Sequence, residues 1–322
     1  MKPLLLSSAL LAMALPAYAG KAFISNERGN TITVLDTETW EVETEFFGGN
    51  RPRGITVSPD GTKLYVCASD DNIVRVFDTT TYEELPSLPS GPDPELFIIE
   101  PSGERLYIAN EDDNLVTVTN TETRTVIAEV PVGVEPEGMG MSPDAKWVVN
   151  TSETTNMAHF ISTEDYKIKH NVLVDQRPRY AQYTADGKRL FVTSEIGGTV
   201  SVMDIAEDGA PTVVGKISFE VPNVQPEWLQ PVGAKVTADG TRLFVALGPA
   251  NRVAVVDAQS LEVLDYILVG QRVWQLDFTP DGKYLLTTNG NSNDITVIDV
   301  AREKAIRSVQ VGDQPWGVVT ID

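Results

Sequence analysis

Two sets of residues, each recurring at a near-constant spacing, contain the groups of this sequence that could do chemistry. The first set follows a position that is proline in six of seven copies: Arg53, Glu95, Glu137, Arg179, Val232, Trp274 and Trp316. Four successive members are charged, whereas the last two are indoles. Such a mixture suits an organic ligand with an apolar body and a charged end, or a charged loop of a protein partner. We therefore interpret the charged and indole members as a ligand- or partner-binding site.

The second set ends a repeated strand-like segment and is rich in carboxylates: Glu27, Ser69, Glu111, Glu153, Glu195, Gly248 and Gly290. Converging glutamates about 8 Å apart would repel one another by about 2 kcal/mol per pair at an effective dielectric constant of about 20. They therefore need a cation, an arginine or shifted pKa values. Oxygen ligands favour a hard ion such as Ca²⁺ over zinc or copper, so the four glutamates are candidate metal ligands. Alternatively, these glutamates project into water and pair with the arginines of the first set, in which case no cofactor is required.

Composition and charge exclude several classes of function. The 322 residues include 25 Lys and Arg against 46 Asp and Glu, which gives a formal net charge of −21. This charge disfavours nucleic acid and anionic membrane surfaces as partners. The single cysteine, Cys67, excludes a disulfide framework and a cysteine-based metal site, and it aligns with small residues that predict a buried, inert thiol. We expect His159 at the surface or between blades and His170 exposed, in neither case with a catalytic role.

An internal repeat identifies the elements that must position these residues. The segment over residues 30–36, Asn-Thr-Ile-Thr-Val-Leu-Asp, returns in six further copies. Successive copies begin 42 residues apart, apart from one interval of 53. The copies are short and alternate apolar with polar residues, and they lack the 3.6-residue periodicity of a helical solenoid. A period of this length built from such strands is typical of four-stranded propeller blades.

The repeat predicts the whole architecture. One unit contains an inner strand over residues 54–57, a tight turn over 58–61, strands over 63–67 and 73–77, and a polar outer strand from residue 82. Seven such units and one insertion of 11 residues within 204–231 account for residues 20–322 as a single domain. Residues 317–321 then pair with residues 21–24 and close the ring. We therefore expect an all-β, seven-bladed β-propeller, with the inserted segment 221–229 and its Trp228 at a blade's outer edge or in the connection to the next inner strand. Trp274 and Trp316 should then stand side by side, roughly opposite the charged arc from Arg53 to Arg179. The aspartates that end the third strands, such as Asp36 and Asp78, should cap the turns that follow.

The first 19 residues have the pattern of a secretory signal peptide that is cleaved after Ala19. Lys2 provides a positive start, residues 4–15 are apolar, and Ala-Tyr-Ala at 17–19 is a small-x-small cleavage site. The apolar stretch is shorter than the roughly 20 residues that span a bilayer, although an anchor or a core strand remains the alternative. We expect a periplasmic or secreted protein without stable membrane insertion.

Residues 105–144, RLYIANEDDNLVTVTNTETRTVIAEVPVGVEPEGMGMSPD, resemble the YVTN-type, WD40-like propeller repeat. Its pattern is a YVAN-like strand, then N-x-[VI]-x-V-x-D-x-x-T, then V-G-x-x-P-x-G-[VI]-x-x-S-P-D-G, and the resemblance extends over all seven units. Seven such repeats behind a signal peptide resemble, more narrowly, the PQQ-dependent catabolism-associated propeller proteins. These are periplasmic accessory proteins of quinoprotein alcohol oxidation and an ABC transport system. The resemblance implies association with that metabolism and does not imply that this chain binds PQQ.

Two functions are compatible with these observations. The first is a non-catalytic periplasmic binding or scaffold protein for quinoprotein alcohol oxidation. Its expected partners are a quinoprotein dehydrogenase, ABC transporter components or a small organic ligand at the channel mouth. The alternative is a lactonase-type hydrolase, because some seven-bladed propellers are lactonases, and Arg53, Arg179, Glu111 and Glu153 could serve. No histidine converges on the mouth to complete an acid–base pair, so we favour the non-catalytic function.

Overall fold

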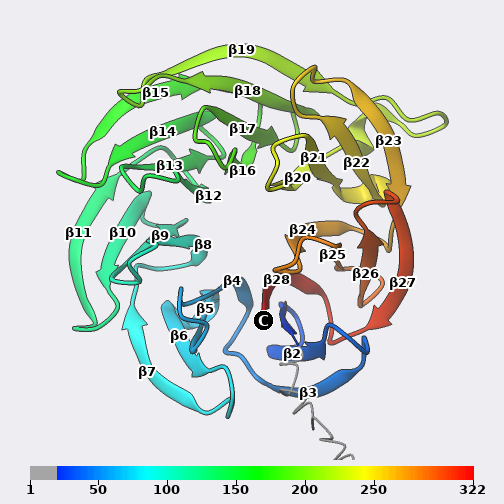
Figure 1. Cartoon of the computed structure of the whole chain (residues 1–322). Coiled ribbons are helices and arrows are strands. Elements are labelled where there is room, and N and C mark those ends of the chain that lie inside the picture. Colours follow the sequence, from blue (N-terminus) through cyan, green and yellow to red (C-terminus); the bar gives the residue numbers. More distant parts are fainter. Residues whose placement is uncertain (1–19) are drawn as a thin grey trace, which may run out of the picture.

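The computed structural model describes residues 20–322 as seven four-stranded antiparallel sheets around a central channel (Figure 1). This arrangement confirms the seven-bladed β-propeller that the 42-residue repeat predicts. The predicted signal peptide, residues 1–19, lies outside the described residues. Within the described part of the chain, no helix is long and apolar enough to cross a bilayer.

The strands follow the repeat, with the inner strand of each blade first. In the first three complete blades they are β4 Pro52–Val57, β5 Lys63–Ala68, β6 Ile73–Asp78, β7 Glu84–Pro89, β8 Pro94–Ile99, β9 Arg105–Asn110, β10 Leu115–Asn120, β11 Thr125–Pro131, β12 Pro136–Met141, β13 Trp147–Ser152, β14 Met157–Ser162 and β15 Ile168–Leu173. In the next three they are β16 Pro178–Tyr183, β17 Arg189–Ser194, β18 Thr199–Ile205, β19 Pro211–Ser218, β20 Pro231–Val236, β21 Arg242–Leu247, β22 Arg252–Asp257, β23 Val263–Leu268, β24 Val273–Phe278, β25 Tyr284–Asn289, β26 Asp294–Asp299 and β27 Lys304–Gln310. Short 3-10 helices cover Ser69–Asp71 (η1), Pro226–Trp228 (η2) and Gly248–Ala250 (η3).

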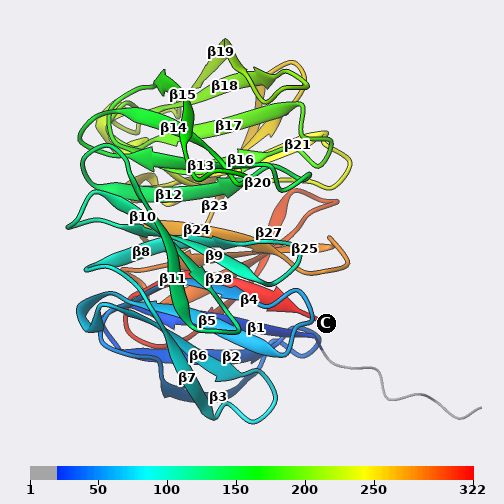
Figure 2. The same cartoon turned by 90° about the vertical axis from the view of Figure 1, so that its left-hand side faces the viewer.

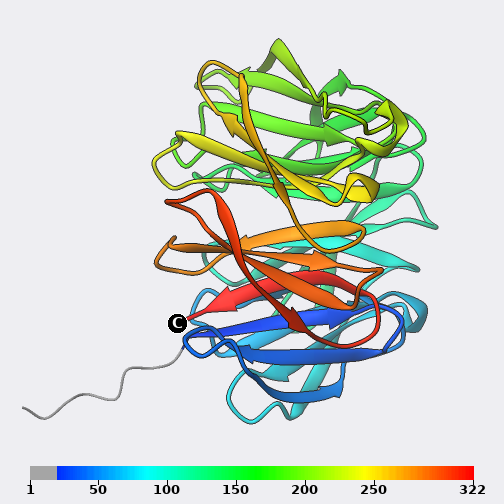
Figure 3. The same ribbon diagram turned by 90° about the vertical axis from the view of Figure 1, so that its right-hand side faces the viewer.

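The seventh blade joins the two ends of the described chain. Strand β28 (Pro315–Ile321) pairs with β1 (Lys21–Asn26), and β2 (Thr31–Asp36) and β3 (Val42–Phe47) complete the sheet. The register places Lys21 opposite Ile321, as the residue count predicts. In both side views the C-terminus lies beside the start of β1 (Figures 2 and 3). Closure pairs both free sheet edges, which removes a template for aggregation.

The hydrophobic core lies between neighbouring blades, where the second and third strands of each sheet are almost fully buried. In β9 and β10 the central residues have no exposed surface, because both faces of the sheet pack against other blades. The outermost strands are largely exposed, as in β27. Inner strands contact one another all around the channel. Their glycines permit this approach: a Cβ on Gly54 would lie 2.4 Å from the carbonyl oxygen of Glu95.

The two ends of the ring carry different connections between strands. We call the mouth the end at which each outer strand connects to the next inner strand, and the turn face the opposite end. On the turn face, Asp36 Oδ1 accepts hydrogen bonds from the backbone N–H groups of Glu38 and Thr39, at 2.8 and 2.7 Å. Asp78 does the same for Thr80 and Thr81. These aspartates stabilise turns, as expected from the repeat.

The inserted residues lengthen one connection at the mouth. Residues 219–230 join β19 to β20 and contain η2, whereas residues 48–51 make the equivalent connection from β3 to β4. Val221 and Leu229 pack into the core of the neighbouring blades, but Trp228 is 58 % exposed. Eight of the 11 inserted residues therefore lengthen the connection between outer and inner strands, which was one of the two expected positions of residues 221–229, and the other three lengthen the turn between β18 and β19.

Candidate functional site

A β-bulge in every inner strand places the first predicted set at the mouth. In β4 the pairing with β5 shifts between Pro52 and Ile55, so Arg53 and Gly54 stand opposite Cys67 alone. The same shift occurs at the equivalent residue of the other six inner strands. A bulge re-aims the side chain of the extra residue. The structure thus brings the predicted set together.

The charged members of this set are held in ion pairs rather than open to a ligand. Arg53 pairs with Glu95, and its Nε lies 3.4 Å from Glu27 Oε1. Glu95 is fully buried, and its Oε2 has no hydrogen-bond partner among the described residues. Two residues before Arg53 in the chain, Arg51 pairs with Asp93 and with Asp70. This half of the mouth contains two arginines that are surrounded by carboxylates.

A second network centres on Arg179, which is 4 % exposed. Its Nη2 lies 3.0 Å from Glu137 Oε1, its Nη1 pairs with Glu153, and its Nε lies 3.6 Å from Glu195 Oε2. Arg272 approaches Glu195 from the opposite side, with 2.7 Å between Nη2 and Oε1. The predicted alternative, in which the ring glutamates pair with Arg53 and Arg179, therefore holds for three of them: Glu27, Glu153 and Glu195.

The two indoles lie side by side, as expected, with ring centroids 6.5 Å apart. They do not form a wall separate from the charges. The Arg53 guanidinium lies 4.9 Å from the Trp316 centroid, and Arg272 lies 4.0 Å from that of Trp274. Trp316 is fully buried. The expected opposition of aromatic and charged arcs is wrong, because Arg53 of the neighbouring blade stacks on Trp316 and Arg272 of the same blade stacks on Trp274.

Burial raises the pKa of several carboxyl groups at the mouth. Desolvation, with the nearby Glu95 and Glu137, raises the pKa of Glu111 to about 8. Burial also raises the pKa values of Glu137 and Glu153 to about 7, although Arg179 opposes the rise. Burial would raise the pKa of Glu195 too, but Arg179 and Arg272 outweigh it and hold that pKa below its usual value. Carboxylates thus outnumber the arginines that could neutralise them.

Two groups of carboxylates are close enough to share a cation, and Glu111 belongs to both. Asp93, Glu95 and Glu111 form one group, and Glu111, Glu135 and Glu153 form the other, each with oxygen atoms within 4.8 Å. Of the four predicted ligands, the structure brings Glu111 and Glu153 together, whereas Glu27 and Glu195 do not belong to either group.

Sequence reasoning missed Asp93 and Glu135 because it aligned the residue after the repeated proline and passed over the residue before it. That preceding position is occupied by Arg51, Asp93, Glu135, Arg177, Gln230, Arg272 and Gln314. This position mixes acidic and basic residues, as the first set does, so the same alignment could have identified it.

The remaining candidate residues are two histidines and one cysteine. His159 is 7 % exposed in β14, where its Nε2 accepts a hydrogen bond from the Gly133 N–H, so its position is between strands and not at the surface. His170 is half-buried against Trp147 and Phe160 rather than exposed. Cys67 is buried as predicted, and burial raises the pKa of its thiol.

Comparison with known proteins identifies the fold. A model of the YNCE-like β-propeller matches residues 232–322, and a model of the WD domain, G-beta repeat matches residues 43–78. No curated protein matches the chain at a significant level.

Several solved structures superpose on most of the ring. One chain of the Kuenenia stuttgartiensis hydrazine synthase is 23 % identical, with a TM-score of 0.78 over 87 % of this chain and 92 % of that one. A putative 6-phosphogluconolactonase from Bacteroides fragilis is 18 % identical (TM-score 0.80, 96 % and 100 % covered). The Pseudomonas aeruginosa periplasmic gluconolactonase is 18 % identical (TM-score 0.77, 94 % and 99 % covered). At these identities the likeness extends to the fold alone. The repeat models and the seven sheets together show that this chain is a β-propeller repeat protein.

Proposed function

We propose that the protein is a non-catalytic binding propeller whose mouth receives a positively charged group of a ligand or partner. The observation that supports this function is the position of Glu111. Its carboxylate lies within 4.8 Å of two separate pairs of carboxylates. Glu111 forms no ion pair with any arginine or lysine of residues 20–322, whereas Arg53 and Arg179 are already engaged by other glutamates. A positive group placed at Glu111 would relieve this repulsion.

Calcium is the simplest probe of this proposal, because a hard cation prefers carboxylate oxygens. We expect Ca²⁺ to bind in isothermal titration and to raise the thermal midpoint of the protein, since binding to the folded state alone stabilises it. Glu111→Gln should weaken this binding at least tenfold. Glu38→Gln, an exposed glutamate on the turn face, is the matched control and should not change it. Equal Ca²⁺ binding by both variants would exclude Glu111 as the receiving group.

The proposed setting of this function is the periplasm, where the protein would serve quinoprotein alcohol oxidation or its transport system. Support comes from the signal-like residues 1–19 and the repeat resemblance, and the exposed Trp228 provides a contact point at the mouth. Cell fractionation tests the compartment. A pull-down from periplasmic extract, with wild type and Glu111→Gln as bait, tests the partner: recovery of a dehydrogenase or transporter component by wild type alone is expected. If neither a dehydrogenase nor a transporter component is recovered, the proposed setting is contradicted. The result of the calcium experiment does not depend on this outcome.

A lactonase is the second candidate, and one observation favours it. Glu153 has a pKa of about 7 and contacts Arg179, so a carboxyl group suited to proton transfer lies beside a group that could bind an oxyanion. Hydrolysis of glucono-δ-lactone above the uncatalysed rate, lost in Glu153→Gln, would establish this activity. We expect no acceleration, because Arg179 is already shared by three glutamates.

A further inference from the structure

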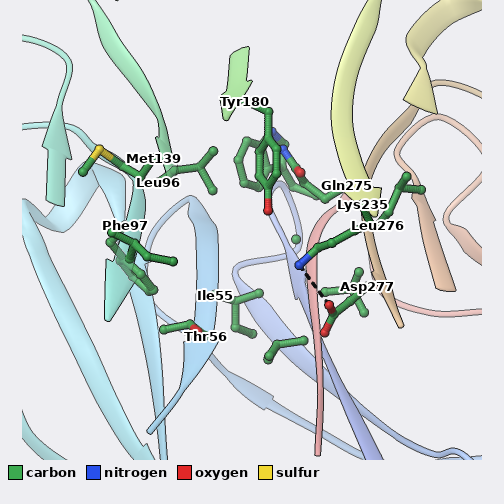
Figure 4. A pocket seen from close by; sticks show the side chains of 15 residues that line it. Ile55, Thr56, Leu96, Phe97, Met139, Tyr180, Lys235, Gln275, Leu276 and Asp277 are labelled. Atoms are coloured by element: carbon green, nitrogen blue, oxygen red, sulfur yellow. Dashed lines mark ion pairs between the residues drawn. The ribbon is translucent and has the colours of Figure 1, made fainter. Parts of the chain in front are cut away.

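A cavity of about 250 Å³ lies inside the channel, below the layer of mouth residues (Figure 4). One side is apolar and contains Ile55, Leu96, Phe97 and Met139. The other side is polar and contains Tyr180, Lys235, Gln275 and Asp277. Trp316 separates the cavity from Arg53 at the mouth. The cavity is therefore distinct from the carboxylate cluster around Glu111.

The polar side is built around an ion pair between adjacent blades. Lys235 Nζ lies 3.0 Å from Asp277 Oδ1, and Figure 4 shows the Tyr180 hydroxyl directed towards the same amine. The Thr320 backbone N–H donates to Asp277 Oδ2 at 2.9 Å and fixes this carboxylate. Burial lowers the pKa of Lys235, but Asp277 and Tyr180 outweigh it and keep the pKa above its usual value, so the amine remains charged.

This pair has no counterpart elsewhere in the ring. The equivalent residues of the other inner strands are Thr56, Ile98, Gly140, Gln182 and Val319. The Lys235 and Asp277 side chains keep 28 % and 18 % of their surfaces exposed, although both belong to inner strands of the channel. Each charge thus retains a face that a molecule in the cavity can reach.

Trp316 provides an independent sign of a missing polar partner. It is fully buried, it lines the cavity, and its indole Nε1 has no hydrogen-bond partner among the described residues. Leaving a buried donor unsatisfied costs about 1–3 kcal/mol, so such groups are uncommon in folded proteins. A ligand acceptor atom within reach of this nitrogen would remove this cost.

We propose that the channel cavity binds a small uncharged molecule that carries a hydroxyl group on an apolar body, such as an aromatic or cyclic alcohol. A hydroxyl oxygen can accept from the Lys235 ammonium while its hydrogen is donated to Asp277, which neither a purely donating nor a purely accepting group can do. An apolar cavity of about 150 Å³ already holds benzene, so the volume suffices for one ring and its substituent. A carboxylate on the ligand would be repelled by Asp277, and an ammonium group would be repelled by Lys235, so both kinds of ligand are disfavoured. This site goes beyond the proposed function at the mouth.

Benzyl alcohol, toluene and benzoate test the proposal, because they share a ring and differ in the polar group. In isothermal titration we expect benzyl alcohol to bind at least tenfold more tightly than toluene or benzoate. The indole N–H resonance of Trp316, assigned with Trp316→Phe, should shift on addition of benzyl alcohol. Equal affinity for benzyl alcohol and toluene would overturn the proposal.

Variants locate the site. Lys235→Met/Asp277→Asn should weaken benzyl alcohol binding at least tenfold. The matched control, Lys169→Met/Asp165→Asn, removes an exposed pair with a similar separation of 2.7 Å and should leave binding unchanged. If the first double variant does not fold, Thr56→Phe, which fills the channel from the opposite side, should abolish binding instead. Unchanged binding in a folded Lys235→Met/Asp277→Asn or Thr56→Phe variant would exclude the cavity as the site.

Discussion

The two ends of the propeller use carboxylates in opposite ways. On the turn face, aspartates such as Asp60 and Asp281 recur from blade to blade, and hydrogen bonds within their own turns lower their pKa values to about 2. At the mouth, the carboxylates change from blade to blade, and burial raises the pKa values of Glu137 and Glu153 to about 7. The turn carboxylates are solvated and locally bonded, whereas the mouth carboxylates depend on arginines from other blades.

This difference shows how to interpret variation within a repeat. A residue that recurs in most units stabilises the unit, because the same local geometry must form in each of them. A position whose residue type differs between blades instead contributes to contacts that form only when the blades come together in the ring. Arg179 illustrates the second case, since its partners Glu137, Glu153 and Glu195 come from three segments of the chain.

The largest effect should follow the loss of Arg179. Arg179→Met leaves the buried Glu137 without an ion pair and removes one partner each from Glu153 and Glu195, which keep Arg177. Breaking a buried pair in this way typically costs about 3–5 kcal/mol. Urea unfolding should show this decrease in the free energy of unfolding. The control Arg28→Met removes a side chain that is 72 % exposed at the same end and should cost under about 0.5 kcal/mol. Equal losses would mean that the mouth pairs are no stronger than surface pairs.

The opposite pKa shifts predict opposite responses to pH. Groups whose folded-state pKa exceeds the usual 4.5 take up protons on folding, so their contribution to stability decreases as pH rises from about 4.5 to about 8. A rise from 4.5 to about 7 at Glu137 alone corresponds to about 3 kcal/mol. The turn aspartates act in reverse: their contribution is lost as pH falls from 3.8 towards about 2.

Thermal unfolding between pH 2 and pH 9, with a chelator present, measures both limbs of this profile. The triple variant Glu111→Gln/Glu137→Gln/Glu153→Gln should flatten the alkaline limb and leave the acid limb unchanged. General charge repulsion would lower stability at high pH in both proteins equally. An unchanged alkaline slope in the triple variant would therefore contradict the role assigned to these glutamates.

A smaller effect is expected at a single turn. Asp60→Ala removes the acceptor of three hydrogen bonds, from the Ser58 hydroxyl, the Thr62 N–H and the Thr62 hydroxyl, and should destabilise the protein by about 1–2 kcal/mol, because the turn is exposed and water replaces part of this bonding. Asp60→Asn, which retains an acceptor oxygen, should lose less. A loss as large as that of Arg179→Met would show that the turn face depends on more than local bonding.

The smallest effect on stability should come from Trp228. Because this side chain is 58 % exposed, Trp228→Ala should change the free energy of unfolding by less than about 0.5 kcal/mol. The same variant should recover less partner in the pull-down, because an exposed indole at the mouth is a contact surface. A large loss of stability would instead show that Trp228 packs on the propeller.

The fold, the blade number, the closing strand and the turn aspartates follow from the sequence alone. Each depends on residues that are close in the chain or on the repeat period, because every blade except the closing one pairs consecutive strands. Asp60, for example, bonds only to its own turn. Alignment of the repeats also placed Arg53, Glu95, Glu137, Arg179 and the two indoles in one layer.

What those residues contact depends on the closed ring and could not be predicted from the repeat. The bulges turn Arg53 and Arg179 towards other blades, where they pair with glutamates and stack on indoles. Likewise, Lys235 and Asp277 stand 42 positions apart and meet only because blades 42 residues apart are neighbours in the ring. Such contacts depend on side-chain length and direction across a closed ring, and neither follows from the period of a repeat.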